Sequence, residues 1–528
     1  MPVAATNNYG MRVIYNLVCN LKLINKEWFL ALLVFFIGCV VRLVPELFAY
    51  PSPIGYDVIN YYIPVTTNFA NHWTQISSEF PLYASFLHVI RIATGLTPYS
   101  IVVISAVIIF GVFAVSVFLI ARKLLKADIR CAFFVTVFVI FQMAVLRTTW
   151  DLHRDVFALS MMLFVFVLIY RESDKKETKN LDWKIIVLAL ILCVLTVSTA
   201  RIVGSLFVMS LIIYSFIMKT KAVILCTIVA LSFFTIELFV NQNITSNIIH
   251  ENIQKTGNGS SVQSIFYNPK NLLYLFVVVD GLLVPTGIIG FKQLRNNKLL
   301  KIPLLISAAG SFSWIVFPFD ESLVADRWIG LLGIFLSIFA AYGLYQLVLR
   351  IKIRRPANGV STSATNNPAL TSPAITMISY FILGIFIIMG ILYEIMPTAH
   401  EPFILWYGMA RSNIEHFVPP SMQFNSLQLS DNYRMISAIS WINKNTQPNA
   451  IIVGEKHWRG FMELYLQDHR TFRFSDDLPT LTSGLIKQGL DAPMYLIHYS
   501  DNKTKNTNVY SNILFSIDKI SQSPHRIR

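Results

Sequence analysis

The sequence predicts a polytopic α-helical membrane protein with about eleven transmembrane helices and a small soluble α/β domain at its C-terminal end. The 528 residues are 55% hydrophobic and only 14% charged, with a mean hydropathy of +0.57, which is too apolar for a soluble globular chain. Apolar runs of about 17–24 residues recur along the chain, and each is long enough to cross roughly 30 Å of hydrocarbon. Beyond Met396 the composition becomes that of a soluble domain.

Eleven apolar segments are expected to span the membrane. They are Trp28–Val44, Ser100–Leu119, Cys131–Leu146, Val156–Tyr170, Ile185–Ser198, Ile202–Met218, Ala222–Val240, Leu272–Gly290, Ile302–Phe317, Trp328–Leu349 and Ala374–Met396. The first ten lie in a transmembrane module of residues 28–349. Residues 1–27 are predicted as a cytoplasmic N-terminus, residues 350–373 as a cytoplasmic linker, and residues 374–396 hold the last span.

The lysine and arginine residues set the predicted orientation. With the N-terminus inside, the inner segments hold roughly 22 of them and the outer loops roughly 7. This count treats Phe80–Gly95 as an amphipathic helix at the interface; as a twelfth span it would reverse the bias. The net charge of +14 is therefore assigned to cytoplasmic loops, and no nucleic-acid partner is expected. The C-terminal domain is then extracytoplasmic, and membrane lipids are expected as partners of the multi-pass chain.

The last 132 residues, 397–528, are expected to form that soluble domain. A helix capped by Asp431 precedes a strand-like Ala450–Gly454, and a helix through Phe461–Leu466 precedes a strand-like Met494–His498. Alternation of helices and strands is typical of an α/β domain.

Acidic and basic residues gather in two of the predicted outer loops. Asp57 lies in the first, and the short second loop contains Asp151, His153, Arg154 and Asp155. Transfer of a sugar to a hydroxyl needs a carboxylate that takes the acceptor proton or holds a metal, and a phosphate leaving group needs cations. Both requirements can be met here. The alternative is that these are ordinary solvated charges, with Asp155 capping the helix that it opens.

Four more charges lie in or at the ends of predicted spans, where an idle charge is costly. Arg42 lies near the outer end of the first span, Arg201 in the turn between the fifth and sixth, and Arg327 opens the tenth. Asp280 falls in the middle of the eighth span and is interpreted as structural, far from the outer face.

These residues give the chain a resemblance to the GT-C superfamily of membrane glycosyltransferases. The shared features are Arg42 at the end of the first span, an acidic residue in each of two outer loops, and Arg327 in Ala325–Leu332. Asp57 followed by Tyr61 is similar to the Asp-Glu-x-x-Tyr form of the mannosyl- and aminoarabinosyl-transferase branch, with Val58 in place of the glutamate.

The resemblance implies an inverting transferase that takes a sugar from a polyprenyl- or dolichyl-phosphate donor and passes it to a protein, lipid or polysaccharide acceptor in the cell envelope. The catalytic residues would be Asp57, Asp151 and Asp155, with Tyr61 at the substrate. The donor phosphate would be bound by Arg42, His153, Arg154, Arg201 and Arg327. A divalent Mg or Mn ion, if one is needed, would be held by Asp57 and Asp151.

The segment Ala438–Val453 resembles the start of the C-terminal domain of the oligosaccharyltransferases. Where that family carries Trp-Trp-Asp-Tyr-Gly, this chain has Gly454-Glu-Lys-His-Trp-Arg-Gly-Phe461, which argues against recognition of N-glycosylation sequons.

Two other classes of function remain open. A transporter or flippase usually shows inverted repeats and broken spans with polar residues at the midplane, whereas here the polar groups gather at the outer surface. A non-catalytic subunit of a cell-envelope assembly would use the soluble domain as a docking module. The residues do not specify the sugar or the acceptor.

Overall fold

The fold is described from a computed structural model of the whole chain. It describes residues 27–51, 54–55, 57–70, 72–73, 76, 81–174, 182–253, 269–294, 297–317, 324–353, 381–382 and 384–391. In the C-terminal part it describes residues 429–520 except 456–457, 468–469, 476–477, 489–491, 501–506 and 513.

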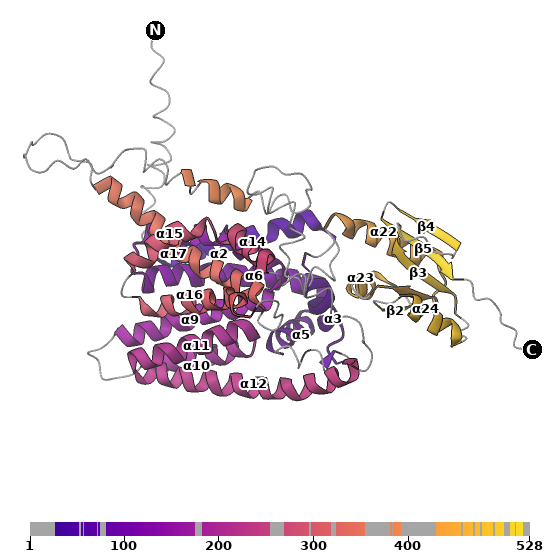
Figure 1. Cartoon of the computed structure of the whole chain (residues 1–528), viewed down its shortest axis with the longest axis horizontal. Helices are drawn as coiled ribbons and strands as arrows, with labels where there is room; N and C mark the ends of the chain where they lie inside the picture. The colour runs from indigo at the N-terminus through magenta and orange to yellow at the C-terminus, as the bar shows by residue number, and fades with distance from the viewer. Residues whose placement is uncertain are drawn as a thin grey trace, which may run out of the picture.

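A large helical bundle makes up most of the molecule, and a smaller unit with a β-sheet lies at one end of it (Figure 1). The bundle contains α2 (Glu27–Ala49), α6 (Pro98–Leu119), its π-helical continuation η3 (Ile120–Leu124), α7 (Ile129–Ile140), α8 (Met143–Asp151), α9 (His153–Asp174), α10 (Trp183–Val197), α11 (Arg201–Met218), α12 (Lys221–Ile253), α14 (Pro269–Val279), α15 (Leu283–Gln293), α16 (Lys298–Ser311), the short η4 (Ser313–Ile315) and α17 (Ala325–Ile353).

Seven helices of the described part are long and apolar enough to cross a membrane, or eight if the bent pair α7 and α8 is one span. The count of eleven therefore stays a prediction. The predicted span Cys131–Leu146 is not one straight helix, because α7 and α8 meet at 58°. The predicted span Leu272–Gly290 is also broken, between α14 and α15. Much of Ala374–Met396 lies outside the described residues.

Small residues let the helices of the bundle approach one another closely. A side chain at Gly38 of α2 would meet the Phe110 carbonyl oxygen at 3.0 Å and Gly111 of α6 at 3.1 Å. Gly290 of α15 lies against Phe339 and Gly343 of α17 in the same way. Without a hydrophobic drive between helices in lipid, such close packing is a main source of association.

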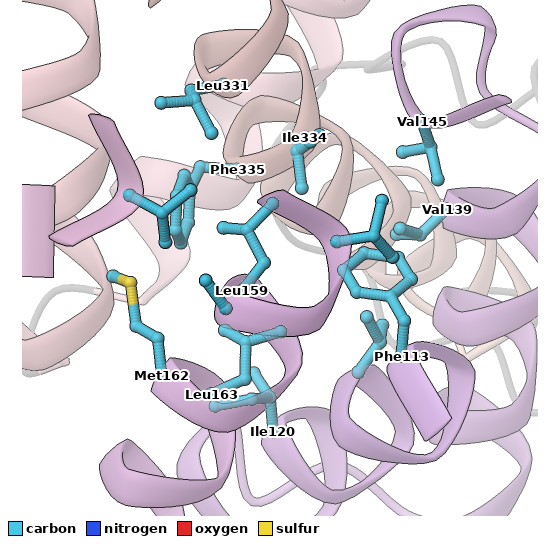
Figure 2. Packing of buried hydrophobic residues seen from close by; sticks show 14 of the residues in the cluster. Phe113, Ile120, Val139, Val145, Leu159, Met162, Leu163, Leu331, Ile334 and Phe335 are labelled. Atoms are coloured by element: carbon cyan, nitrogen blue, oxygen red, sulfur yellow. The ribbon is translucent and has the colours of Figure 1, made fainter. Parts of the chain in front are cut away.

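Figure 2 shows the centre of this packing, where side chains of α6, η3, α7, α8, α9 and α17 interlock. Phe113, Leu159, Phe335 and Val139 are at most 1% exposed. The outer helices are apolar on their exposed side too: on α12, Ile228, Ile236 and Phe239 are more than half exposed. A large exposed apolar surface of this kind is what a lipid-facing helix presents.

The segment between α2 and α6, named the first loop below, holds the small helices η2 (Val58–Tyr62), α3 (Ile63–Thr67) and α5 (Leu82–Thr94). Helix α5 has 13 residues, too few to cross a membrane. It buries Tyr83, Ala84 and Leu87 and exposes Val89 and Ile92, as expected of an amphipathic helix at the interface.

The C-terminal unit contains a five-stranded sheet in the order β2-β1-β3-β5-β4. The strands are β1 (Ile451–Gly454), β2 (Thr471–Phe474), β3 (Met494–Tyr499), β4 (Thr507–Ser511) and β5 (Phe515–Ile520), and the helices are α22 (Leu429–Asn445), α23 (Arg459–Tyr465) and α24 (Leu478–Lys487). Strands β2, β1 and β3 are parallel, while β5 runs antiparallel to β3 and β4.

Both faces of this sheet are covered, so its central strands are buried along their length. Ile452 of β1 packs with α22 and α23, whereas its neighbours Ile451 and Val453 pack with Leu485 of α24. Successive side chains of a strand point to opposite faces, which explains this alternation. The unit contacts the bundle through α23, which packs on η2 and α3 of the first loop.

Candidate functional site

Arg42 is the centre of a buried polar cluster at the end of α2. Its side chain is fully buried; its Nε donates to the Thr149 carbonyl oxygen at 3.1 Å, and its Nη2 donates to Glu46 Oε1 at 2.6 Å. The same Nη2 lies 3.4 Å from His153 Nε2 at the start of α9. Arg42 thereby joins α2, α8 and α9, which explains why the bundle tolerates a charge in this apolar helix.

The first loop closes over this cluster with aromatic side chains. Tyr62 of η2 stacks on the His153 ring with centroids 5.2 Å apart, and Tyr83 of α5 meets Tyr62 edge-on at 5.1 Å. Burial raises the pKa of the Tyr62 phenol well above its ordinary value, and the Asp57 carboxylate raises it further. Burial also raises the pKa of Tyr83, against the opposing effect of Arg42. Both phenols therefore stay neutral and keep their protons.

Polar atoms of this cluster that are buried without a hydrogen-bond partner among the described residues include Arg42 Nη1, Glu46 Oε2 and the hydroxyls of Tyr62 and Tyr83. Buried polar groups in folded proteins are nearly always hydrogen-bonded to protein, water or a ligand. The cluster therefore has hydrogen-bond donors and a carboxylate acceptor that can bind the polar groups of a ligand or water.

Asp57 precedes η2 directly, and its side chain is half-buried. Its carboxylate is close enough to the Tyr62 phenol to act on it electrostatically. The sequence prediction that Asp57 stands out in an apolar, aromatic loop agrees with this position, since Val58, Ile59, Tyr61 and Tyr62 are all buried.

A second group of charged side chains, those of Arg154, Asp155 and Arg327, lies beside the Arg42 cluster. The Arg154 guanidinium lies 5.6 Å from the centre of the Tyr61 ring, a cation–π arrangement. Asp155, in the first turn of α9, is 6% exposed and interacts electrostatically with both Arg154 and Arg327. Arg327 is half-buried in the first turn of α17, so residues far apart in the sequence meet here.

One predicted site residue is not brought into this arrangement. Arg201 opens α11 with an exposed side chain, and the described contacts give it no hydrogen bond or ion pair with the cluster. Asp151 ends α8, and its part in the site stays a prediction because its side chain lies outside the described part of the structure. The remaining predicted residues, Arg42, Asp57, Tyr61, His153, Arg154, Asp155 and Arg327, lie on α2, the first loop and the starts of α9 and α17.

Sequence reasoning missed Glu46, Tyr62 and Tyr83. Glu46 could have been found, because an acid one helical turn after Arg42 in an apolar helix is placed to pair with it. Tyr62 and Tyr83 gave no such signal, because tyrosine in a loop is common and their convergence depends on how the first loop folds.

Asp280 is fully buried at the break between α14 and α15, and both its oxygens lack a hydrogen-bond partner among the described residues. It packs against Gly333 of α17, where an added side chain would approach its Oδ1 at 2.5 Å. Gly333 lies six residues along α17 from Arg327, and the interpretation of Asp280 as a structural residue stays a prediction.

The described residues contain no complete set of metal ligands, because no three His, Cys, Asp or Glu side chains among them lie close enough together to hold a metal ion. The two buried carboxylates of the site have arginines as neighbours, Arg42 for Glu46 and both Arg154 and Arg327 for Asp155. The predicted metal ligands, Asp57 and Asp151, stay a prediction because the Asp151 side chain lies outside the described residues.

Comparison with known proteins identifies the fold. No protein-family description and no curated protein sequence matches this chain. ArnT from Cupriavidus metallidurans bound to undecaprenyl phosphate is similar in structure, with a TM-score of 0.54 at 12% identity over 94% of this chain and 98% of ArnT. Its apo state has a TM-score of 0.54 at 11% identity, over 97% and 98% of the two chains.

The oligosaccharyltransferase from Archaeoglobus fulgidus in its apo form gives a TM-score of 0.51 at 13% identity, over 90% of this chain and 70% of that one. ArnT is an aminoarabinose transferase, and both proteins are members of the GT-C superfamily. The chain thus has the GT-C fold, and the resemblance predicted from its sequence is confirmed at the level of the fold.

Proposed function

We propose that this chain is a membrane glycosyltransferase that takes a sugar from a polyprenyl-phosphate-linked donor. The observation that carries the proposal is the charged cluster of Arg42, Asp57, Arg154, Asp155 and Arg327 on a GT-C fold. The similarity to ArnT bound to undecaprenyl phosphate supports a lipid-phosphate partner.

In the proposed reaction, an acceptor oxygen attacks the anomeric carbon of the donor sugar. The bond from that carbon to the phosphate oxygen breaks, and its electron pair leaves with the polyprenyl phosphate. A single displacement of this kind inverts the configuration at the anomeric carbon. Asp57 takes the proton of the acceptor hydroxyl, and the cations Arg154 and Arg327 stabilise the charge that develops on the phosphate.

Arg42 has a different part in this proposal. Its bonds to Thr149, Glu46 and His153 hold α2, α8 and α9 in place beneath the first loop. The neutral phenols of Tyr62 and Tyr83 have hydroxyls without a hydrogen-bond partner in the part of the chain that the structure describes, and these can bind polar groups of a substrate or water. Tyr61, under the Arg154 guanidinium, would contact the donor sugar or its phosphate.

Orientation and acceptor belong to the proposal as well. The positive-inside bias supports a cytoplasmic N-terminus and reaction at the outer face of a multi-pass membrane protein. The acceptor is a protein, lipid or polysaccharide of the cell envelope. Sequon recognition is not expected, because Trp458 is completely buried in the core of the C-terminal unit and so cannot bind an acceptor peptide.

The test is a transfer assay with purified protein and a panel of polyprenyl-phosphate sugars. Release of the free carrier from at least one donor is expected. No release from any donor, with folded protein that still binds undecaprenyl phosphate, would favour the docking-subunit alternative.

The same assay tests the metal. Turnover lost to EDTA and restored by Mg or Mn would support metal binding at Asp57 and Asp151. Turnover that EDTA leaves unchanged would assign Asp57 to proton transfer alone.

A further inference from the structure

The C-terminal unit reaches the first loop at one point of very close approach. Gly460 of α23 lies directly on the backbone of η2, and a Cβ at this position would overlap with the Ile59 carbonyl oxygen and crowd the Asn60 Cα. A backbone carbonyl cannot rotate away as the end of a long side chain can. Any residue other than glycine at position 460 must therefore move α23 or η2.

Two polar contacts hold the first loop on either side of this point. The Tyr465 hydroxyl donates to the Pro51 carbonyl oxygen at 2.8 Å, ahead of Asp57 in the chain. Beyond η2, Arg459 Nη2 lies 2.9 Å from His72 Nε2. Arg459 is itself fixed by an ion pair with Glu463 at 2.5 Å. The loop is thus held before, at and after η2 by one helix of the C-terminal unit.

Helix η2 divides its side chains between the two parts of the molecule. Ile59 is 4% exposed and belongs to the core of the C-terminal unit, together with Trp458 and Phe461. Val58, Tyr61 and Tyr62 belong to the core of the bundle. With Asp57 immediately before η2, the position of this carboxylate depends on both cores.

We infer that the C-terminal unit positions Asp57, and that Gly460 is a positioning residue for the proposed transfer. The inference rests on the proposed function. Contact of α23 with η2 fixes the backbone that carries Asp57 and Tyr62. The donor-phosphate arginines are carried by α9 and α17 of the bundle, and Arg154 also contacts η2 through the Tyr61 ring. Loss of the contact between α23 and η2 should therefore lower turnover more than it lowers affinity for the lipid phosphate.

The test uses full-length protein with Gly460→Ala, which adds only the overlapping methyl group. Gly484→Ala is the matched control, because a Cβ at this helical glycine of the same unit meets nothing within 4 Å. Tyr465→Phe removes only the hydroxyl that donates to the Pro51 carbonyl oxygen, and it is the less disruptive variant to use if Gly460→Ala folds poorly. Melting temperatures identify the variants that remain folded.

Two readouts separate the inference from the proposed function. Hydrogen exchange of amides 58–67 is expected to rise about tenfold in Gly460→Ala, less in Tyr465→Phe and not in Gly484→Ala, as local opening predicts. Carrier release from a donor used by the wild type should fall about tenfold in Gly460→Ala, with a clearly smaller change in the Kd for undecaprenyl phosphate.

Unchanged exchange in both loop-contact variants would overturn the inference. So would raised exchange with wild-type turnover, because the contact would then hold the loop without serving the reaction. A wild-type protein that releases no carrier, with exchange raised in Gly460→Ala, would contradict the proposed function and leave the contact between α23 and η2 supported.

Discussion

At the scale of single residues, the site depends on charges that are buried in pairs. The Arg42–Glu46 pair is 0% and 3% exposed and lies in an otherwise apolar helix. Removing one partner of a buried pair leaves the other charge uncompensated, which usually costs about 3–5 kcal/mol. Replacing both partners avoids this penalty.

Arg42→Met should therefore destabilise the protein by about 3–5 kcal/mol, and the double variant with Glu46→Met by clearly less. Reversible unfolding in mixed detergent micelles measures both. Equal or greater destabilisation in the double variant would show that the pair does not act as a unit.

The arginines differ in a way that makes one of them a control. Arg154 and Arg327 both act on the Asp155 carboxylate, whereas Arg201 is exposed on α11. Arg154→Ala and Arg327→Ala are each expected to weaken undecaprenyl phosphate binding by about 1.5–3 kcal/mol, the range for a hydrogen bond to a charged group. Arg201→Ala should change it by less than about 0.5 kcal/mol. Calorimetric titration of the three variants with undecaprenyl phosphate measures these changes. A loss of affinity confined to Arg201→Ala would show that the phosphate does not bind at Arg154 and Arg327.

At the scale of elements, the length of the apolar runs predicted the positions of the helices well. It did not predict which of these helices are broken. The break within Leu272–Gly290 occurs at Asp280-Gly281, and the bend within Cys131–Leu146 lies near Gln142. The mean hydropathy of a segment does not reveal such breaks, because one or two polar residues change the average very little. The strands β1 and β3 coincide with the two strand-like segments, because buried β-branched and aromatic runs are distinctive. Strand β2, with mostly exposed residues, gave no comparable signal.

The broken element α14–α15 provides a prediction of its own. A buried carboxyl group without a hydrogen-bond partner among the described residues is costly, and Leu has a similar shape without polar atoms. Asp280→Leu should raise the free energy of unfolding by about 1 kcal/mol or more and leave carrier release unchanged. Thermal unfolding and the transfer assay measure the two effects. Lower turnover without loss of stability would give Asp280 a functional role that its position does not suggest.

At the scale of the whole molecule, the contact between the C-terminal unit and the first loop could not have been predicted. Gly460 and Ile59 are separated by about 400 residues, and glycine in a loop-to-helix segment usually reflects local conformation. The sequence did identify Asp57 by its apolar, aromatic loop, and Arg42 and Arg327 by their positions at the ends of apolar spans. It could not show that Tyr62 and Tyr83 close over Arg42, since this depends on the fold of the first loop.

Orientation is also a property of the whole molecule, and the distribution of lysine and arginine predicts it. A cysteine in place of Ser483, an exposed position on α24, should react with a membrane-impermeant thiol reagent in intact cells. A cysteine in place of Ser361, in the predicted cytoplasmic linker, should react only after the cells are opened. The opposite pattern would invert the topology and place the site on the cytoplasmic side.

The most direct test of the proposed function is carrier release by Asp57→Asn. Asparagine keeps the size and much of the hydrogen bonding of Asp57 but cannot take a proton. Turnover should fall about 100-fold or more, as loss of a general base commonly causes, while the Kd for undecaprenyl phosphate and the melting temperature stay close to wild type. Asp155→Asn, which removes a carboxylate that faces two arginines, should be impaired less severely. Transfer at the wild-type rate by Asp57→Asn would contradict the account.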